Sequence, residues 1–362
     1  MERVLQVIRS MGYGGAETFI MNLYRNMDRE KIQFDFLVNS DGKYDEEIRE
    51  LRGKIYKIPY ITEVGQAKYV KELKKFFKNH PEYQIIHSHI DQVSGIIVET
   101  ANKCDIKKII SHSHNTKNSN GILGKLYKSY LQSKINKNTT DKLACGIDAA
   151  KWLYKKSWKD AIIINNGIDI DKFRYNEKNR QSIRKSLGIE KDTIVIGHVG
   201  RFSKQKNHKF LLDIFYEFQK NRNDSILLLV GNGKLKKTIE KKARKLKIEN
   251  KVIILSDRND TYKIYSAFDI MVFPSLFEGL SVALIEAQCN GLKVLASNNI
   301  DKNTDITGNI FYENLNNTPK KWAEKIESIN LDRNDIKEKF QNSEYDIKNV
   351  AKRMENIYLS KI

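Results

Sequence analysis

The sequence predicts an α/β fold in which two domains each contain a parallel sheet. Short apolar, β-branched runs alternate with longer stretches that have helical periodicity. Strands that alternate with helices favour parallel sheets covered by helices on both faces. The alternation continues for too long to form one open sheet, and a length of 362 residues is typical of two domains.

The individual elements follow from these runs. The predicted strands are residues 4–8, 34–38, 54–58, 85–89, 108–111, 142–145, 162–164, 193–199, 226–230, 252–255, 270–273 and 293–296. The predicted helices include residues 16–27, 70–77, 208–220, 235–246 and 345–359. Residues 169–189 are polar and charged, so we expect a linker with a short helix there.

The predicted domains are residues 1–172, joined by a terminal helix at about 345–362, and residues 173–344. Two such domains imply a cleft between them, and ligands of parallel sheets bind beyond the carboxyl ends of the strands. The residues that carry chemistry should therefore follow the predicted strands.

Charge and composition narrow the classes of partner. The formal net charge is +19, which favours acidic partners such as nucleic acid, anionic lipid or a phosphorylated substrate. The three cysteines form no CxxC pair, and so few in a long chain suit a reducing cytosol. The apolar run at residues 4–8 is too short for a secretory signal, and no stretch approaches the roughly 20 apolar residues of a spanning helix. We therefore expect a cytoplasmic protein.

Glycine-rich turns follow two of the predicted strands. Gly14 and Gly15 precede a predicted helix, where backbone amides favour an anion, but a tight turn explains them equally well. Gly231 belongs to a similar turn, in which Lys236 occupies the place of a third glycine. Neither turn completes a dinucleotide fingerprint, so a dehydrogenase is not supported.

Two cations, Arg201 and Lys206, follow Gly200 at the end of the strand predicted at residues 193–199. Such charges bind a diphosphate and stabilise it as a leaving group, and a guanidinium suits bidentate contact with phosphate. The alternative is a pair of solvated surface cations.

The most informative stretch is FPSLFEGLSVALIEAQ at residues 273–288. A strand ends at Phe273, the loop contains Glu278, and a helix begins near Ser281, a favourable N-cap residue. Free amides at a helix start bind a phosphate or sugar oxygen, and a carboxylate beside them accepts hydrogen bonds from sugar hydroxyls. Glu286 lies in an otherwise apolar helix, where it either meets a partner or faces solvent.

Two histidine clusters follow successive predicted strands. His87 and His89 form the first, and His112 and His114 form the second. Imidazoles bind zinc, but no carboxylate or cysteine stands at helical metal-site spacing. We therefore expect a role in substrate binding or proton transfer.

Together these segments resemble glycosyltransferase family 4, whose members have the GT-B fold of two Rossmann-like domains facing across a cleft. The resemblance covers nearly the whole chain. It rests on GGAET at 14–18, HSH at 87–89, SHSHNT at 111–116, NNGID at 165–169, GRFSKQKN at 200–207, LLLVGNG at 227–233 and the stretch at 273–288 with its two glutamates seven residues apart. The sequences of the segments SHSHNT and GRFSKQKNH are most similar to those of bacterial capsular or exopolysaccharide glycosyltransferases.

The resemblance implies a role for each site residue. The donor would be bound by Gly14, Gly15, Arg201, Lys206, Gly231, Glu278, Gly279, Leu280, Ser281 and Glu286, with Glu286 on the ribose. The residues implied in catalysis are His114, Glu278, Arg201 and Lys206. His89 and His112 are assigned to the acceptor, and His112 competes with His114 for the position beside the donor sugar.

The implied activity is transfer of a hexose, with retention, from a nucleotide-diphosphate sugar to a growing glycan. Uridine is the expected base, and a lipid-linked acceptor at the inner face of the cytoplasmic membrane fits the positive charge. We expect no cofactor, no metal and no nucleic-acid partner, and peripheral contact with an anionic membrane surface. The alternatives are a nucleotide-sugar epimerase of the same fold and, from a different class, a basic nucleic-acid-binding protein.

Overall fold

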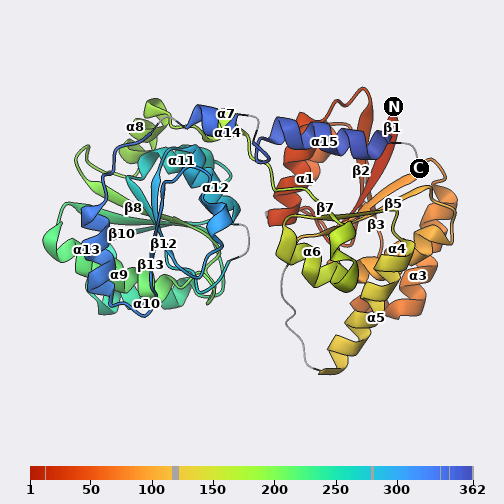
Figure 1. The fold of residues 1–362 in the computed structure, drawn as a ribbon, viewed down its shortest axis with the longest axis horizontal. Helices are drawn as coiled ribbons and strands as arrows, with labels where there is room; N and C mark the ends of the chain where they lie inside the picture. The colour runs from red at the N-terminus through yellow and green to blue at the C-terminus, as the bar shows by residue number, and fades with distance from the viewer. Residues whose placement is uncertain (13, 116–121, 279–280, 335, 342, 361–362) are drawn as a thin grey trace. The chain divides into compact units, whose positions relative to one another are not determined.

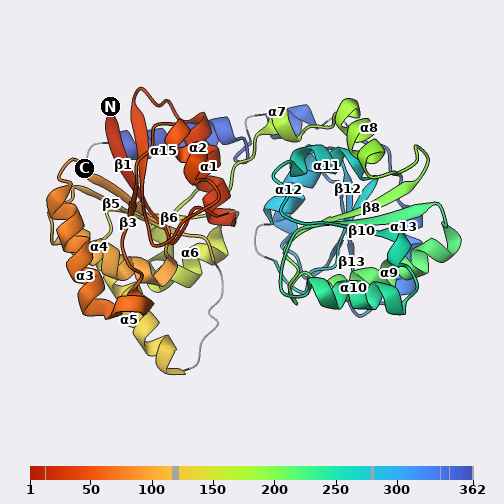
Figure 2. The ribbon, with the colours of Figure 1, turned by 180° about the vertical axis from the view of Figure 1, so that it is seen from behind.

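The computed structural model describes residues 1–12, 14–115, 122–278, 281–334, 336–341 and 343–360 (Figures 1 and 2). The chain divides into two compact units. The first unit comprises Met1–Gly167 and Glu344–Ile362, and the second comprises Ile168–Ser343. The predicted boundary at residue 172 falls inside the short helix α7 (Ile170–Phe173), which belongs to the second unit.

The first unit contains a seven-stranded sheet in the order β3-β2-β1-β4-β5-β6-β7, and its neighbouring strands are parallel. The strands are β1 (Glu2–Val7), β2 (Ile32–Val38), β3 (Ile55–Lys57), β4 (Ile85–Ser88), β5 (Lys108–Ser113), β6 (Asp141–Ala144) and β7 (Ile162–Ile163). Each corresponds to a predicted strand. Strands of a parallel sheet are buried on both faces, so they have the nearly continuous apolar sequences from which they were predicted.

Helices cover both faces of this sheet (Figure 1). One face packs against α1 (Gly15–Asn26) and the C-terminal helix α15 (Ile347–Leu359). The other packs against α3 (Ile61–Asn79), α4 (Ser94–Asn102), α5 (Ile122–Asn138) and α6 (Ile147–Tyr154). The remaining elements of this unit are α2 (Asp45–Glu50), η1 (Asp91–Val93) and η2 (Lys155–Asp160). The terminal helix predicted at 345–359 thus packs on the sheet of the first unit.

The second unit contains a six-stranded parallel sheet in the order β10-β9-β8-β11-β12-β13. The strands are β8 (Ile194–Val199), β9 (Ser225–Val230), β10 (Val252–Leu255), β11 (Ile270–Phe273), β12 (Lys293–Ser297) and β13 (Ile310–Glu313). β13 was not among the predicted strands. It is an edge strand of four residues, and three of them are only partly buried, so it lacks the apolar pattern of the others.

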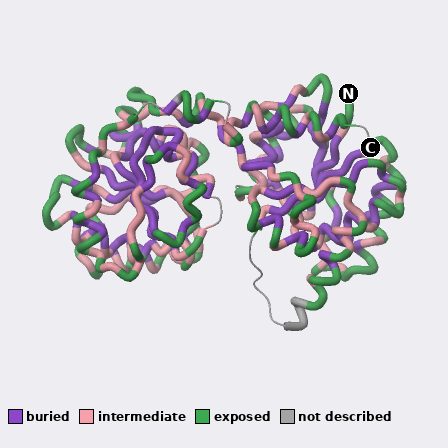
Figure 3. The backbone as a smooth tube through the Cα atoms, viewed as in Figure 1, coloured by how far each residue is buried: buried purple, intermediate pink, exposed green. Residues whose placement is uncertain are grey.

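The helices of the second unit also lie on both faces of its sheet (Figure 2). α9 (His208–Asn221), α10 (Lys236–Lys245) and α13 (Pro319–Ser328) share one apolar core. α11 (Thr261–Ala267) and α12 (Val282–Cys289) cover the opposite face (Figure 2). Two 3-10 turns, η3 (Glu249–Lys251) and η4 (Lys302–Thr304), and the short helix α14 (Lys337–Phe340) complete the unit. In both units burial is concentrated in the strands and in the helix faces turned toward them (Figure 3).

Residues 169–189 are not the linker that their polar sequence predicts. They form α7 and α8 (Glu177–Ser186), which belong to the second unit. Arg180 and Arg184 each place an Nη2 atom 2.6 Å from a carboxylate oxygen of Asp269. Arg184 also donates to the carbonyls of residues 190, 191 and 193, so its charge is buried with partners. The charged sequence here reflects a helix anchored by buried ion pairs.

The strand order determines where a ligand can bind in each unit. In both sheets the first strand of the unit is central, and the chain continues first to one side of it and then to the other. The connections therefore diverge at two neighbouring central strands, which are β1 and β4 in the first unit and β8 and β11 in the second. Ligands of such sheets bind outside the carboxyl ends of these strands.

Candidate active site

The loop after β8 is held by two close backbone contacts that only glycine permits. Gly231 has φ +148, and a Cβ there would lie 2.2 Å from the carbonyl oxygen of Gly200. Gly233 has φ +153, and its Cβ would lie 2.5 Å from the carbonyl oxygen of Phe202. Since β-carbons do not fit, the turn after β9 supports the backbone on either side of Arg201. Gly231 therefore allows the turn after β9 to pack directly against the loop that carries Arg201.

The structure brings Lys206 and Glu278 together at the ends of β8 and β11. The Nζ atom of Lys206 lies 2.9 Å from Oε1 of Glu278, and the two side chains are only 14% and 8% exposed. The ammonium also lies 4.5 Å from the centroid of the Phe273 ring. Burial lowers the pKa of Lys206, while the Glu278 carboxylate acts in the opposite direction. The two residues were predicted separately as a phosphate and a sugar ligand, and they form one ion pair.

Hydrogen bonds from the backbone and from the Gln205 side chain join the two loops that carry this pair. The N–H of Leu276 donates to the carbonyl of Gln205 at 2.8 Å, and the Gln205 amide donates to the carbonyl of Phe277 at 3.0 Å. Glu278 also pairs with Ile300 in an isolated parallel bridge. Arg201 is exposed at the start of the same loop, and its positive charge further lowers the pKa of Lys206. Arg201, the Lys206–Glu278 ion pair and the two bonded loops therefore lie together at the carboxyl ends of β8 and β11, where the connections of the second sheet diverge.

Ser281 is the N-cap residue of α12, as predicted, but its side chain makes no capping hydrogen bond. Its carbonyl accepts the N–H groups of Leu284 and Ile285 at 3.0 and 3.3 Å. The amides that precede Leu284 have no partner within the helix, and the N–H groups at such a helix start favour an anion. Gly279 and Leu280, which complete the predicted donor loop, lie outside the described residues.

Glu286 does not lie on a solvated helix face, which was one of its two sequence interpretations. Tyr265 donates its hydroxyl hydrogen to Oε2 of Glu286 at 2.7 Å. Burial raises the pKa of the Glu286 carboxyl from its ordinary value to about 7, and the hydrogen bond from Tyr265 acts in the opposite direction. Glu286 is therefore a half-buried residue whose carboxyl has a hydrogen-bond partner and changes charge near neutral pH.

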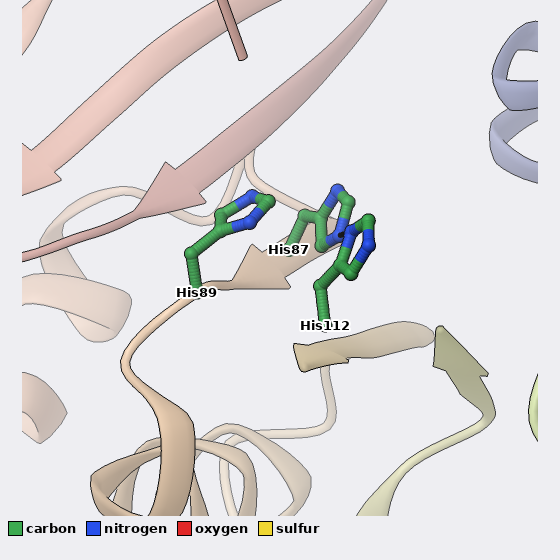
Figure 4. Close-up of side chains that lie close together, drawn as sticks. All are labelled: His87, His89 and His112. Carbon is green, nitrogen blue, oxygen red and sulfur yellow. Dashed lines mark hydrogen bonds between the residues drawn. The ribbon is translucent and has the colours of Figure 1, made fainter. Parts of the chain in front are cut away.

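The first unit contains four clustered imidazoles at the carboxyl ends of β4 and β5. Figure 4 shows three of them, those of His87, His89 and His112. His87 and His112 lie within the two strands, and His89 and His114 follow them. His89 Nδ1 lies 2.8 Å from His114 Nε2, and His87 Nε2 lies 3.2 Å from His112 Nδ1. The rings of His112 and His114 stack with centroids 4.2 Å apart. The two histidine clusters therefore lie together at one place in the first unit.

Burial lowers the pKa of every imidazole in this cluster. The pKa of His114 falls to about 3, and those of His87, His89 and His112 are lowered by burial and by one another. All four rings are therefore neutral at physiological pH. Nitrogen atoms of His87, His89 and His112 lie within 4.8 Å of one another, close enough to share a metal ion, but these rings already form hydrogen bonds within the cluster.

The start of α1 places a carboxylate beside the glycines that were predicted to bind an anion. Gly14 is the N-cap residue of α1 and Gly15 its first residue. A Cβ on Gly14 would meet the Glu17 carboxylate at 2.2 Å, whereas one on Gly15 would have nothing within 4 Å. Glu17 repels a phosphate at Gly14, so the role of these glycines in donor binding stays a prediction.

Three kinds of comparison place the chain among known proteins. Residues 179–346 match the family model described as glycosyl transferases group 1. EpsF of Bacillus subtilis, named as a glycosyltransferase, is 35% identical over 333 residues, which cover 90% of this chain and 87% of EpsF. The chain belongs to the group 1 glycosyl transferases.

Further relatives of this glycosyltransferase include the capsular polysaccharide biosynthesis glycosyltransferase CapH of Staphylococcus aureus, which is 27% identical over 100% of this chain and 99% of CapH. A UDP-Gal:alpha-D-GlcNAc-diphosphoundecaprenol alpha-1,3-galactosyltransferase of Escherichia coli is 23% identical over 82% of this chain and 79% of that enzyme. The crystal structure of Anabaena Alr3699/HepE in complex with UDP matches with a TM-score of 0.73 and 18% identity, over 99% of this chain and 95% of HepE. The fold is thus that of two Rossmann-like domains, as in the GT-B enzymes.

Three polar residues beside the histidine cluster were not predicted. Gln6 and Tyr358 are buried beside the histidines and bond to them. Asp91 has φ +42, and its Oδ2 accepts a hydrogen bond from the Asn115 amide at 2.7 Å. Burial raises the pKa of Asp91 to about 6. Of the three, only Gln6 could have been found from the sequence. It is a polar residue within an apolar strand, and a buried polar residue often marks a functional contact.

Among the described residues, no helix combines the length and the apolar character that a bilayer crossing requires.

The pKa of Glu286 predicts a pH-dependent stability difference. The carboxyl has an ordinary pKa of 4.5, which applies to the unfolded chain, and a pKa of about 7 in the folded protein. The folded state therefore binds more protons in this window, and stability is lost as the pH rises from 4.5 to 7. We expect Glu286→Gln to have a melting temperature close to that of the wild type at pH 5 and above it at pH 8. The exposed Glu324→Gln serves as control and should show no such trend; an equal difference at both pH values for Glu286→Gln would contradict the buried carboxyl.

Proposed function

We propose that this glycosyltransferase transfers a hexose, with retention, from a UDP-sugar to a lipid-linked glycan acceptor in capsular or exopolysaccharide biosynthesis. The observation that carries the proposal is the Lys206–Glu278 pair at the carboxyl ends of β8 and β11, with Arg201 on the same loop. This arrangement offers cations to a diphosphate and a carboxylate to sugar hydroxyls within one site. Glu286, on α12, supplies a second carboxyl for the hydroxyls of a ribose.

The relatives support the chemical classes of donor and acceptor. The name of the Escherichia coli relative specifies a UDP-sugar donor and a diphosphoundecaprenol-linked acceptor. CapH is named for capsular polysaccharide biosynthesis, and HepE was crystallised with UDP. A sugar nucleotide with a uridine base and a lipid-diphosphate acceptor is therefore the combination that we propose for this chain.

The proposed reaction breaks the bond between C1 of the donor sugar and the diphosphate oxygen, which keeps the electron pair. Arg201 and Lys206 stabilise the charge that develops on the departing diphosphate, and the first amides of α12 add to it. The acceptor hydroxyl attacks C1 on the face that the diphosphate leaves, and its proton passes to the departing phosphate oxygen. Configuration at C1 is retained because bond breaking and attack occur on the same face. His114 and its neighbours bind the acceptor on the first unit, where they present neutral hydrogen-bonding groups.

A surface on the first unit suits the lipid side of this proposal. Leu126, Tyr127 and Tyr130 of α5 are 69%, 42% and 51% exposed, and the helix extends away from the rest of its unit (Figures 1 and 3). The adjoining α6 and η2 carry the exposed lysines Lys151, Lys155, Lys156 and Lys159. Apolar and tyrosine side chains beside lysines are typical of surfaces that bind anionic bilayers. We therefore propose a protein of the cytoplasm that binds the inner face of the membrane peripherally.

Removal of Arg201 should weaken nucleotide binding. Arg201→Ala removes an exposed cation without unpairing Glu278, and we expect about 10-fold to 100-fold weaker binding of UDP, as the loss of a charge-assisted hydrogen bond implies. The matched control is Lys204→Ala, which removes an exposed cation from the same loop. Isothermal titration with UDP, GDP and ADP measures the effect. Equal affinity of both variants and the wild type for UDP would contradict the assignment of Arg201, and tighter binding of GDP or ADP would contradict the uridine base.

Transfer should proceed without a bound metal ion. The cations and helix amides of the second unit already supply the electrostatic stabilisation that a divalent ion gives in other enzymes. We expect full transfer activity after dialysis against EDTA, assayed as nucleotide release on addition of acceptor. Loss of activity that zinc restores would instead assign a metal to the histidine cluster.

Binding to membranes should depend on charge and on α5. We expect sedimentation with phosphatidylglycerol vesicles at low ionic strength, release by salt, and no sedimentation with phosphatidylcholine vesicles. The double variant Leu126→Ser, Tyr130→Ser should reduce sedimentation, whereas Leu359→Ser, which changes a residue 45% exposed on α15, should not. Unchanged sedimentation of the double variant would place the membrane contact elsewhere on the protein.

A further inference from the structure

The four clustered histidines, His87, His89, His112 and His114, belong to a hydrogen-bond network that begins at Tyr358. The hydroxyl oxygen of Tyr358 lies 3.3 Å from Nε2 of Gln6 and 2.7 Å from Nδ1 of His87. From Tyr358, one branch continues through Gln6, and the other continues through His87. Gln6 comes from β1 and Tyr358 from α15, so the network joins the first strand of the chain to its last helix.

The branch through Gln6 has a fixed direction. Gln6 turns its Nε2 toward Tyr358 and its Oε1 toward Nε2 of His89, which lies 2.8 Å away. An amide oxygen only accepts, so His89 must carry its proton on Nε2. His89 is neutral because burial lowers its pKa, and its Nδ1 is therefore an acceptor. The nitrogen that faces it, Nε2 of His114 at 2.8 Å, must then be the donor.

His114 thus ends this branch with an unprotonated Nδ1. Burial lowers its pKa to about 3, so the ring has a single proton, which is used on Nε2. Nδ1 is buried and has no hydrogen-bond partner among the described residues. The lone pair on Nδ1 of His114 therefore has no hydrogen-bond donor among the described residues.

The branch through His87 ends with a hydrogen-bond donor instead of an acceptor. Because Tyr358 accepts a hydrogen bond from Gln6, its own O–H is free to donate to Nδ1 of His87. The proton of neutral His87 then lies on Nε2 and is donated to Nδ1 of His112 at 3.2 Å. His112 is left with a protonated Nε2, which is also buried without a partner in the described part of the chain.

We infer that Gln6 and Tyr358 are positioning residues that fix the polarity of this network, so that His114 presents a hydrogen-bond acceptor and His112 a donor. The two rings stack with centroids 4.2 Å apart and both contact Phe19, at 5.1 and 5.7 Å. A sugar hydroxyl donates one hydrogen bond and accepts others, so an adjacent acceptor and donor match it. The assignment of that hydroxyl to the acceptor glycan rests on the proposed function, whereas the polarity rests on the hydrogen bonds alone.

The polarity is tested directly by long-range ¹H–¹⁵N correlation spectra of the full chain labelled with ¹⁵N-histidine. We expect His87, His89, His112 and His114 all to carry their proton on Nε2. His198 is an internal control of the opposite kind, because its Nδ1 lies 2.9 Å from the carbonyl oxygen of Val272 and must donate to it. Histidine-to-glutamine variants assign the signals. A proton on Nδ1 of His89 or His114 would overturn the inference.

Variants of Gln6 test what the polarity does. Gln6→Leu removes the acceptor for His89, and we expect Nδ1 of His114 to become partly protonated and kcat to fall about 10-fold to 100-fold, with KM for the donor unchanged. Gln6→Glu keeps an accepting oxygen, so it should keep the Nε2 proton on His89 and most of kcat. Its negative charge also favours imidazolium, so the pH profile should move to higher pH. If the native polarity were reversed, Gln6→Glu would lose activity as Gln6→Leu does.

The control is Gln33→Leu, the same substitution at a buried glutamine of β2 that bonds to Tyr24 instead of to a histidine. It should leave the four tautomers and kcat unchanged. Tyr358→Phe should alter the signals of His87 and His112 first, because Tyr358 is their donor. Predicted tautomers together with an unchanged kcat in Gln6→Leu would overturn the positioning role. Absence of transfer by the wild type from any nucleotide-sugar would contradict the proposed function and leave the spectra to decide the polarity.

Discussion

The constraint on which this structure depends is the order of strands in its two parallel sheets. Each unit begins with a central strand and builds the sheet first on one side and then on the other, so neighbouring strands at the centre have connections that diverge. The space between those connections is where a ligand meets the backbone. Gln6, His87 and His89 lie at that point in the first unit, and Arg201, Lys206 and Glu278 lie there in the second. Residues far apart in the sequence meet because the topology leaves this position open.

The Lys206–Glu278 pair shows how the second unit keeps charges in a partly buried place. An isolated buried ion costs several kcal/mol, and an ion pair there gives little net stability, whereas removal of one partner costs about 3–5 kcal/mol. The pair is therefore better explained by function than by stability. The hydrogen bonds from Leu276 to residue 205 and from the Gln205 side chain to residue 277 hold the two loops in register, so that the ammonium and the carboxylate keep their relative positions.

Sequence reasoning succeeded where a pattern is local and failed where partners come from a distance. The apolar runs located every strand except β13, whose partly exposed residues resemble a loop. The segment at 169–189 was interpreted as a linker because its sequence is polar and charged. The partner of its arginines, Asp269, lies about 85 to 90 residues further along the chain, so the local sequence could not reveal the ion pairs. For the same reason the solvated alternative for Glu286 stayed open until Tyr265 was seen to bond to it. Gln6 and Tyr358, at opposite ends of the chain, were found only through their contacts with the histidines.

The two units differ in the electrostatic character of their sites, and this difference fits a reaction that joins an anionic donor to a neutral hydroxyl. The second unit places an exposed guanidinium, an ammonium and helix amides at its switch point, which are the groups that stabilise a diphosphate. The first unit buries imidazoles so that they stay neutral, and a neutral ring donates or accepts a hydrogen bond without competing for the diphosphate. A charged cluster in the first unit would attract phosphate as well, and the proposed donor could then bind in the wrong place. In the proposed reaction, burial of the histidines by Phe19 and by the packing of α15 therefore keeps the donor out of the first unit as well as fixing the geometry of the rings.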